Sequence, residues 1–265
     1  MMECRVDDKI KKASQFSRLD ASMPLRKPDT DQLRSIPLFR DVSDGSMPIL
    51  LKSASIQQFR TRTLLFTEGD QASSLYTVMQ GSVELFSEHH ERRSTIAVIR
   101  SRKPFLLTSM HEDNLNPFSA CTLERSHLMV IPLKIMNELI KSDVLFARAM
   151  MVELVSEVRQ LVEHCKNQRL RTTVERLAEW MLRADQAAGG TGQFVIPHDK
   201  RILASYLGME AESLSRNLAS LATMGVVVRG RHVSLSDRAA LARLAGIEIA
   251  APALGAFGDT ENEFV

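Results

Sequence analysis

Cysteine, tryptophan and long apolar runs are scarce in this chain of 265 residues, which excludes several classes of protein. The three cysteines, Cys4, Cys121 and Cys165, form no CxxC pair, so neither a disulfide framework nor a zinc site is indicated. No apolar run approaches the roughly 18 residues that span a bilayer, and residues 1–12 lack the apolar core of a signal peptide. We therefore expect a cytoplasmic protein without a membrane partner.

A strong charge of one sign is missing as well, since the formal net charge is only +2 at pH 7. The distribution of charge is more informative. Between Arg169 and Arg243, eleven Lys and Arg stand against seven Asp and Glu, whereas the chain after Arg243 has four acidic residues and no basic one. A basic C-terminal third supports a polyanionic partner. Enzyme chemistry is not expected, because no nucleophile–base arrangement, glycine-rich phosphate loop or metal spacing is present.

The order of the patterns predicts an α+β protein in five parts. Residues 1–30 are polar with little periodicity, which predicts a mobile arm. Residues 31–133 contain short β-type runs between turn formers, which predict a small antiparallel roll acting as a sensor domain. A long helix over 134–168 and a helix-turn-helix domain with a β-hairpin wing over 169–246 follow. The last part, 247–265, is an acidic tail.

The predicted long helix has the clearest periodicity in the chain. Its a/d heptad seam has spacings of four, three, four, three and four residues and consists of Ala147, Met151, Leu154, Val158, Leu161 and Cys165. So narrow a seam favours a two-stranded coiled coil and hence a homodimer; the alternative is an amphipathic helix packed on its own domain. A further hypothesis is that Cys165 pairs with its copy across the dimer axis on oxidation, the alternative being a small apolar packing residue.

Residues 200–221 match a helix-turn-helix. Ala204 is small enough for two steeply crossing helices to touch, and Gly208 tolerates the positive φ of the tight turn between them. The second helix has an apolar inner face. Its outer face carries three side chains at positions i, i+3 and i+4, which project together: Glu212, Ser215 and Arg216. Such a helix fits the major groove of B-DNA; a helical hairpin in an enzyme core is the alternative.

Residues 36–245 resemble the CRP/FNR family of transcription regulators. The resemblance is carried by the heptad helix, the helix-turn-helix and three short motifs, Ile36–Phe39, Glu68–Asp70 and Gly81–Val83. The segments 167–172, 174–177 and 199–201 are similar to FtrB-like members. The resemblance implies a cyclic-nucleotide-binding-type β-roll, a long dimerisation helix and a winged helix-turn-helix. It also implies three partners, namely double-stranded DNA, a second copy of the chain and RNA polymerase.

The arrangement Glu-x-x-Ser-Arg over 212–216 resembles FNR-like recognition helices, which implies an inverted repeat of TTGAT half-sites. Ala211 stands where CRP has a further Arg, which favours the FNR-like site. Arg216 can donate a bidentate pair to guanine, Glu212 can accept from cytosine, and Ser215 adds a weaker contact. The candidate phosphate contacts, each alternatively a plain surface residue, are Arg169, Arg171, Lys200, Arg201, Ser213, Asn217, Arg229 and Arg231.

The signal that the roll senses is not identified by the sequence, but two familiar ones are disfavoured. Cyclic-nucleotide binders of this fold use a Gly-Glu pair and an Arg; Leu106, Leu107 and Phe118 replace them here, so a cyclic AMP phosphate would be desolvated without compensation. An FNR-type iron–sulfur cluster needs four thiolates, and the chain has three cysteines.

Besides a redox signal or no ligand at all, two other kinds of signal stay open. An apolar or aromatic effector would contact Phe105, Leu106, Leu107 and Phe118, for which a filled core is the alternative. Haem would use Cys121 and a histidine from the set His89, His90, His111 and His127. The polar residues around His89 and His90 favour a solvated hairpin tip instead. The alternative function is a ligand- or haem-binding sensor that acts mainly through a protein partner.

Overall fold

The computed structural model describes the chain in five stretches: residues 26–90, 92–100, 102–105, 107–110 and 113–247. The chain divides into two compact units, one with residues 1–91 and 96–158, the other with 92–95 and 159–265. Most of the predicted arm and nearly all of the predicted acidic tail lie outside the described residues. No helix in the described stretches is long and apolar enough to cross a membrane.

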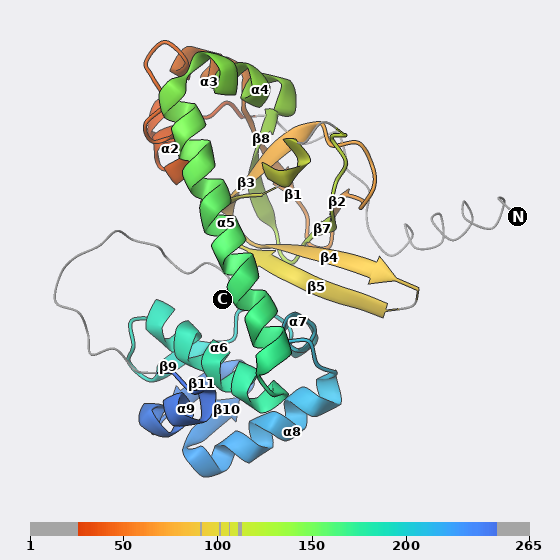
Figure 1. The fold of residues 1–265 in the computed structure, drawn as a ribbon, viewed down its shortest axis with the longest axis vertical. Helices are drawn as coiled ribbons and strands as arrows, with labels where there is room; N and C mark the ends of the chain where they lie inside the picture. Colours follow the sequence, from red (N-terminus) through yellow and green to blue (C-terminus); the bar gives the residue numbers. More distant parts are fainter. Residues whose placement is uncertain (1–25, 91, 101, 106, 111–112, 248–265) are drawn as a thin grey trace, which may run out of the picture. The chain divides into compact units, whose positions relative to one another are not determined.

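Two four-stranded sheets form the first unit (Figure 1). One has the order β1-β8-β3-β6, with β1 Ser55–Phe59, β8 Ser126–Pro132, β3 Ser74–Gln80 and β6 Pro104–Phe105. The other has the order β2-β7-β4-β5, with β2 Leu64–Phe66, β7 Ser119–Thr122, β4 Val83–His89 and β5 Arg92–Ile99. The pairs of β8 with β1 and β3, and of β7 with β2 and β4, are antiparallel. The predicted roll is therefore confirmed.

Helices cover the outer face of the first sheet. Side chains alternate along a strand, so Leu75 of β3 and Met129 and Ile131 of β8 point to the same side and are fully buried. They join a core that also takes residues from α2, a 3₁₀ turn, α3, α4 and α5. Their bounds are α2 Thr30–Arg34, η1 Pro37–Phe39, α3 Met47–Ser53, α4 Leu133–Ser142 and α5 Val144–Leu170.

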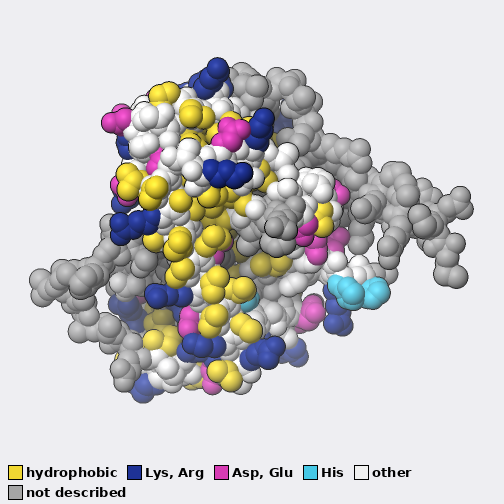
Figure 2. All heavy atoms as spheres, turned by 45° about the horizontal axis from the view of Figure 1, so that its top comes forward, with side chains coloured by type: hydrophobic (Ala, Val, Ile, Leu, Met, Phe, Trp, Pro, Cys, Tyr) yellow, Lys and Arg dark blue, Asp and Glu magenta, His cyan; other side chains and the backbone are white. Residues whose placement is uncertain are grey.

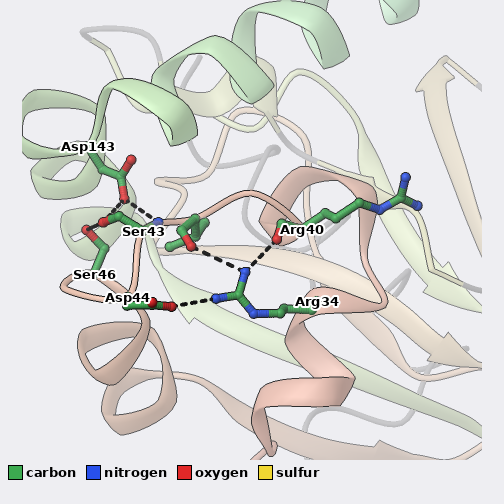
Figure 3. A network of polar contacts seen from close by, with 7 residues as sticks. Arg34, Arg40, Ser43, Asp44, Ser46 and Asp143 are labelled. Atoms are coloured by element: carbon green, nitrogen blue, oxygen red, sulfur yellow. Dashed lines mark hydrogen bonds and ion pairs between the residues drawn. The ribbon is translucent and has the colours of Figure 1, made fainter.

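The prediction of one unbroken helix over 134–168 is wrong, because the chain breaks at Asp143, between α4 and α5. Asp143 has extended backbone, and its Oδ1 accepts from the Phe146 amide at 3.1 Å, which caps α5. Its Oδ2 accepts from the Ser43 amide at 3.0 Å and the Ser43 hydroxyl at 2.7 Å (Figure 3). Burial opposes ionisation of Asp143, but hydrogen bonds from Ser43, Phe146 and Ser46 outweigh it and hold its pKa below the ordinary value.

The described part of the second unit combines the end of α5 and four further α-helices with a three-stranded sheet of order β10-β11-β9. Its core contains Leu177 and Met181 of α6, Leu203 of α7 and Leu214 of α8. The predicted wing strands are present as β10 Val226–Arg229 and β11 His232–Leu235. The other elements are α6 Thr173–Ala187, β9 Gln193–Val195, α7 Lys200–Tyr206, α8 Ala211–Leu221, η3 Ala222–Met224 and α9 Arg238–Ala245.

Candidate nucleic-acid interface

Helices α7 and α8 and the turn between them form the helix-turn-helix that the sequence predicts. Ala204 is 2% exposed, and its carbonyl accepts from the Met209 amide at 3.0 Å, which joins α7 to the turn before α8. Gly208 has φ +65°, as predicted. A Cβ there would also lie 2.4 Å from Oε1 of Gln168, at the end of α5. Glycine is therefore needed for close approach as well as for its φ angle.

The inner and outer faces of α8 differ as the sequence predicts. Leu214 and Leu221 are at most 1% exposed and belong to the core of the second unit. Three exposed side chains share the opposite face of the helix: Glu212, Ser215 and Arg216. The structure thus brings the three predicted base-reading residues together on solvent-facing surface.

The polar side chains of α8 bond locally. Arg216 Nη2 donates to Ser213 Oγ at 3.2 Å. Ser215 Oγ donates to the Ala211 carbonyl at 3.1 Å. Both bonds are exposed and join neutral acceptors, so exchanging them for a base edge costs little. The Asn217 amide lies against Met209 Sδ at 3.6 Å and is half-buried.

The predicted phosphate contacts fall into two groups. Five are exposed, namely Arg169, Lys200, Arg201, Arg229 and Arg231, whereas Arg171, Ser213 and Asn217 are half-buried. Arg171 instead bonds the Ala245 carbonyl and forms an ion pair of 3.4 Å with the buried carboxylate of Glu179. Its guanidinium is therefore occupied inside the unit, and we leave Arg171 out of the proposed interface.

Arg231 also has an internal role. Its Nε donates to the Ile196 carbonyl at 2.6 Å, and Nη2 bonds the Pro197 carbonyl. These contacts tie the wing to the segment that leads into α7. Arg231 thus orients the wing, whether or not it also approaches a phosphate.

The predicted effector residues do not all gather. Phe105 and Phe118 are linked through Phe66, whose ring centroid lies 6.3 and 6.2 Å from theirs. Tyr76 stacks on Phe105 at 5.6 Å, and burial raises the pKa of its phenol. Leu107 belongs to the helix-covered core instead. Leu106 lies outside the described residues. Phe66 and Tyr76 were not predicted, although both are aromatic residues within the region of short β-type runs, 31–133.

The candidate haem ligands are dispersed among the strands. His89 ends β4 and is exposed together with its neighbour His90, as a hairpin tip predicts. His127 lies on β8, and buried Cys121 lies on β7, in the other sheet. His111 is outside the described residues. Within the described part of the chain, no three His, Cys, Asp or Glu side chains gather as a metal site.

The predicted seam on α5 is an apolar surface. Its exposed members are Met151 at 66%, Leu154 at 37%, Val158 at 59%, Leu161 at 64% and Cys165. Ala147 is half-buried. Hydrophobic side chains gather on the face along which α5 runs (Figure 2). Apolar side chains so exposed along one helix are typical of an interaction surface.

Comparisons with known proteins give the same domain order. Residues 56–143 match the cyclic nucleotide-binding domain, and residues 175–244 match the Crp-like helix-turn-helix domain. The transcriptional activator protein FnrA of Stutzerimonas stutzeri is 25% identical over 187 residues, which cover 69% of this chain and 77% of the relative. The fumarate and nitrate reduction regulatory protein of Escherichia coli strain K12 is 23% identical over 203 residues, covering 75% and 80%.

The fold is also that of solved structures. FixK2 from Bradyrhizobium japonicum matches with a TM-score of 0.66 and 23% identity, over 75% of this chain and 99% of FixK2. The helix-turn-helix match includes both α7 and α8. The chain therefore has the two domains of a CRP/FNR-type transcription regulator, a cyclic nucleotide-binding domain followed by a Crp-like helix-turn-helix domain.

Proposed function

We propose that two copies of the chain bind an inverted repeat with FNR-like TTGAT half-sites, reading it with Glu212, Ser215 and Arg216. The observation that carries this proposal is the shared exposed face of these side chains on a helix whose other face is buried. Arg216 pairs with guanine O6 and N7, and Glu212 accepts from cytosine N4. Relatives named FnrA and fumarate and nitrate reduction regulatory protein support the choice of half-site.

The dimer is proposed from the apolar seam of α5. Burying a leucine side chain that was exposed contributes about 1.5–3 kcal/mol. Met151, Val158 and Leu161 are each more than half exposed in the single chain, so covering them in two copies favours association. Parallel pairing along α5 would present the two α8 helices to successive major grooves. RNA polymerase is the partner that such a regulator meets at a promoter.

Exposed cations supply the contacts that do not depend on sequence. Arg169, Lys200, Arg201 and Arg229 are candidates for phosphate pairing, with Ser213 in the first turn of α8 and Asn217 in its middle. Each neutralised phosphate releases a counterion, so affinity should fall steeply as salt is raised.

The β-roll is proposed to sense a signal other than cyclic AMP. An apolar or aromatic effector would contact the rings of Phe66, Phe105 and Phe118. None of the four predicted pocket residues is basic, so none of them could neutralise the phosphate of cyclic AMP. The signal would act by changing the packing of α5 and hence the placement of the two reading helices. Native mass spectrometry with an absorbance spectrum reports a retained effector, haem and the stoichiometry together.

The experiment that tests the function is a gel shift with a fluorescent TTGAT inverted repeat, a scrambled palindrome and a repeat whose guanine is replaced. The wild type should prefer the intact repeat. Arg216→Ala should lose about 1–3 kcal/mol of binding free energy on the intact repeat. On the guanine-substituted repeat, its affinity should equal that of the wild type. Arg243→Ala, which removes an exposed charge from α9, is the control. Equal wild-type affinity for the intact and scrambled sites overturns the proposed half-site.

A further inference from the structure

The turn of the helix-turn-helix is held by side chains from outside it. Three consecutive carbonyls, those of Tyr206, Leu207 and Gly208, accept hydrogen bonds from two side chains. Arg176 on the first turn of α6 donates from Nε to Leu207 at 2.8 Å and from Nη2 to Gly208 at 3.3 Å. Gln168 near the end of α5 donates from Nε2 to Tyr206 at 3.4 Å.

The same guanidinium also bonds the end of α5. Arg176 Nη1 donates to the Arg171 carbonyl at 2.8 Å and to the Gln168 carbonyl at 3.3 Å. Because α5 ends at Leu170, the last carbonyls of this helix have no partner within it and carry partial negative charge. Arg176 is 9% exposed, and burial lowers its pKa, yet a guanidinium stays charged in proteins. One cation thus stabilises the C-terminal ends of both α5 and α7.

The last two turns of α5 contact the helix-turn-helix at further points. The His164 ring centroid lies 5.4 Å from that of Tyr206. Gln168, one turn later, lies so close to Gly208 that a Cβ there would be 2.4 Å from Oε1. All these residues belong to the second compact unit. These contacts join the end of α5 to the turn that precedes α8.

We infer that Arg176 is a positioning residue, which fixes the direction of α8 relative to the end of α5 and so sets the half-site spacing that the dimer accepts. The inference rests on the proposed dimeric DNA binding. Lysine, with one ammonium group, cannot present the planar fork that reaches carbonyls of both α5 and the turn. Each added base pair moves a half-site by about 3.4 Å along the duplex and turns it by roughly 34°. Loss of the fork should therefore relax the choice of spacing.

The test measures fluorescence anisotropy on inverted repeats whose spacers differ by one and two base pairs in either direction. The wild type should bind the repeat with the preferred spacer roughly tenfold or more tightly than a repeat whose spacer is two base pairs longer. For Arg176→Met, the same ratio of affinities should be less than about threefold. Arg176→Lys should fall between them. Arg243→Met, which removes an equal charge from exposed α9, should keep the wild-type optimum.

The ratio between two spacings does not depend on the fraction of active protein, so partial unfolding does not imitate the effect. The single tryptophan, Trp180, is 5% exposed on α6 and reports whether the unit is folded. If Arg176→Met does not fold, Arg176→Lys carries the test. A wild type that binds no repeat at any spacing refutes the proposed function. A wild type with a sharp optimum that the foldable Arg176 variants retain in full refutes only the positioning role.

Discussion

Replacing Asp143 should uncouple the start of α5 from the loop that precedes α3. Asp143→Ala removes the helix cap on the Phe146 amide, a loss of about 0.5–2 kcal/mol. It also leaves the half-buried Ser43 amide without its acceptor and the Ser43 hydroxyl with Ser46 Oγ alone, about 1–3 kcal/mol more. Together we expect the first unit to lose about 1.5–5 kcal/mol of unfolding free energy.

Asp143→Asn separates the contribution of shape from that of charge. Its amide oxygen can still cap Phe146, but the NH₂ group then faces the Ser43 N–H, so about half of the loss should remain. Asp44→Asn is the control, because Asp44 pairs with Arg34 at 3.0 Å with its side chain fully exposed (Figure 3). This variant should unfold like the wild type.

Urea unfolding followed by circular dichroism measures these differences, while Trp180 fluorescence follows the second unit. The folded-state pKa of Asp143 is lowered. Its contribution is therefore complete above the ordinary carboxyl pKa of about 4 and is lost as the pH falls through the lowered value. The wild type should approach Asp143→Asn in strong acid. An Asp143→Ala protein with the wild-type midpoint at pH 7 refutes the reasoning.

Two further predictions concern α5 itself. Leu161→Glu should raise the dimer dissociation constant about 100-fold or more by analytical ultracentrifugation. Val152→Glu, equally exposed but off the seam, should leave it unchanged; equal effects would reject the seam. Glu157 has a pKa raised to about 7 by burial and by Glu153, against the opposing charge of Lys103. Because the pKa of this carboxyl is raised in the folded state, the free energy of unfolding should fall as the pH rises from about 5 to 7, by about 3 kcal/mol at most. Urea titrations of Glu157→Gln should no longer show this pH dependence.

Local patterns predicted the parts of the fold that depend on local rules. Short β-type runs between turn formers predicted the strands of the roll, and the predicted β-hairpin wing is present as β10 and β11. Ala204, Gly208 and the two faces of α8 followed from the steric needs of a tight turn and from helical spacing. The two-residue strand β6 is too short to show alternation.

The break at Asp143 escaped prediction because the apolar spacing continues through it. Met136, Leu139, Phe146 and Met150 follow one another by three, seven and four residues and are all buried, as they would be on a single helix. The prediction that the long helix ends at residue 168 overlooked a local signal. Thr172 and Glu175 form the capping box that starts α6, and α5 continues to Leu170.

Long-range contacts could not be predicted in this way. A charged side chain in a basic region looks the same whether it faces a phosphate or a carbonyl of its own chain. The bonds of Arg171 to Ala245 and of Arg176 to Leu207 join residues 74 and 31 positions apart. Only the folded chain distinguishes these two arginines from exposed Arg169 and Arg201.

The main segment of the second compact unit begins at Arg159, inside α5. A chimaera that combines the β-roll of one relative with the helix-turn-helix domain of another should therefore be joined within this helix. A fragment cut at residue 169 would lose His164 and Gln168, and with them the support of the Tyr206 carbonyl and ring. One that starts at residue 159 keeps both. Chimaeras joined at Val158, with the heptad register preserved, should therefore retain a helix-turn-helix domain whose orientation is still set by the end of α5.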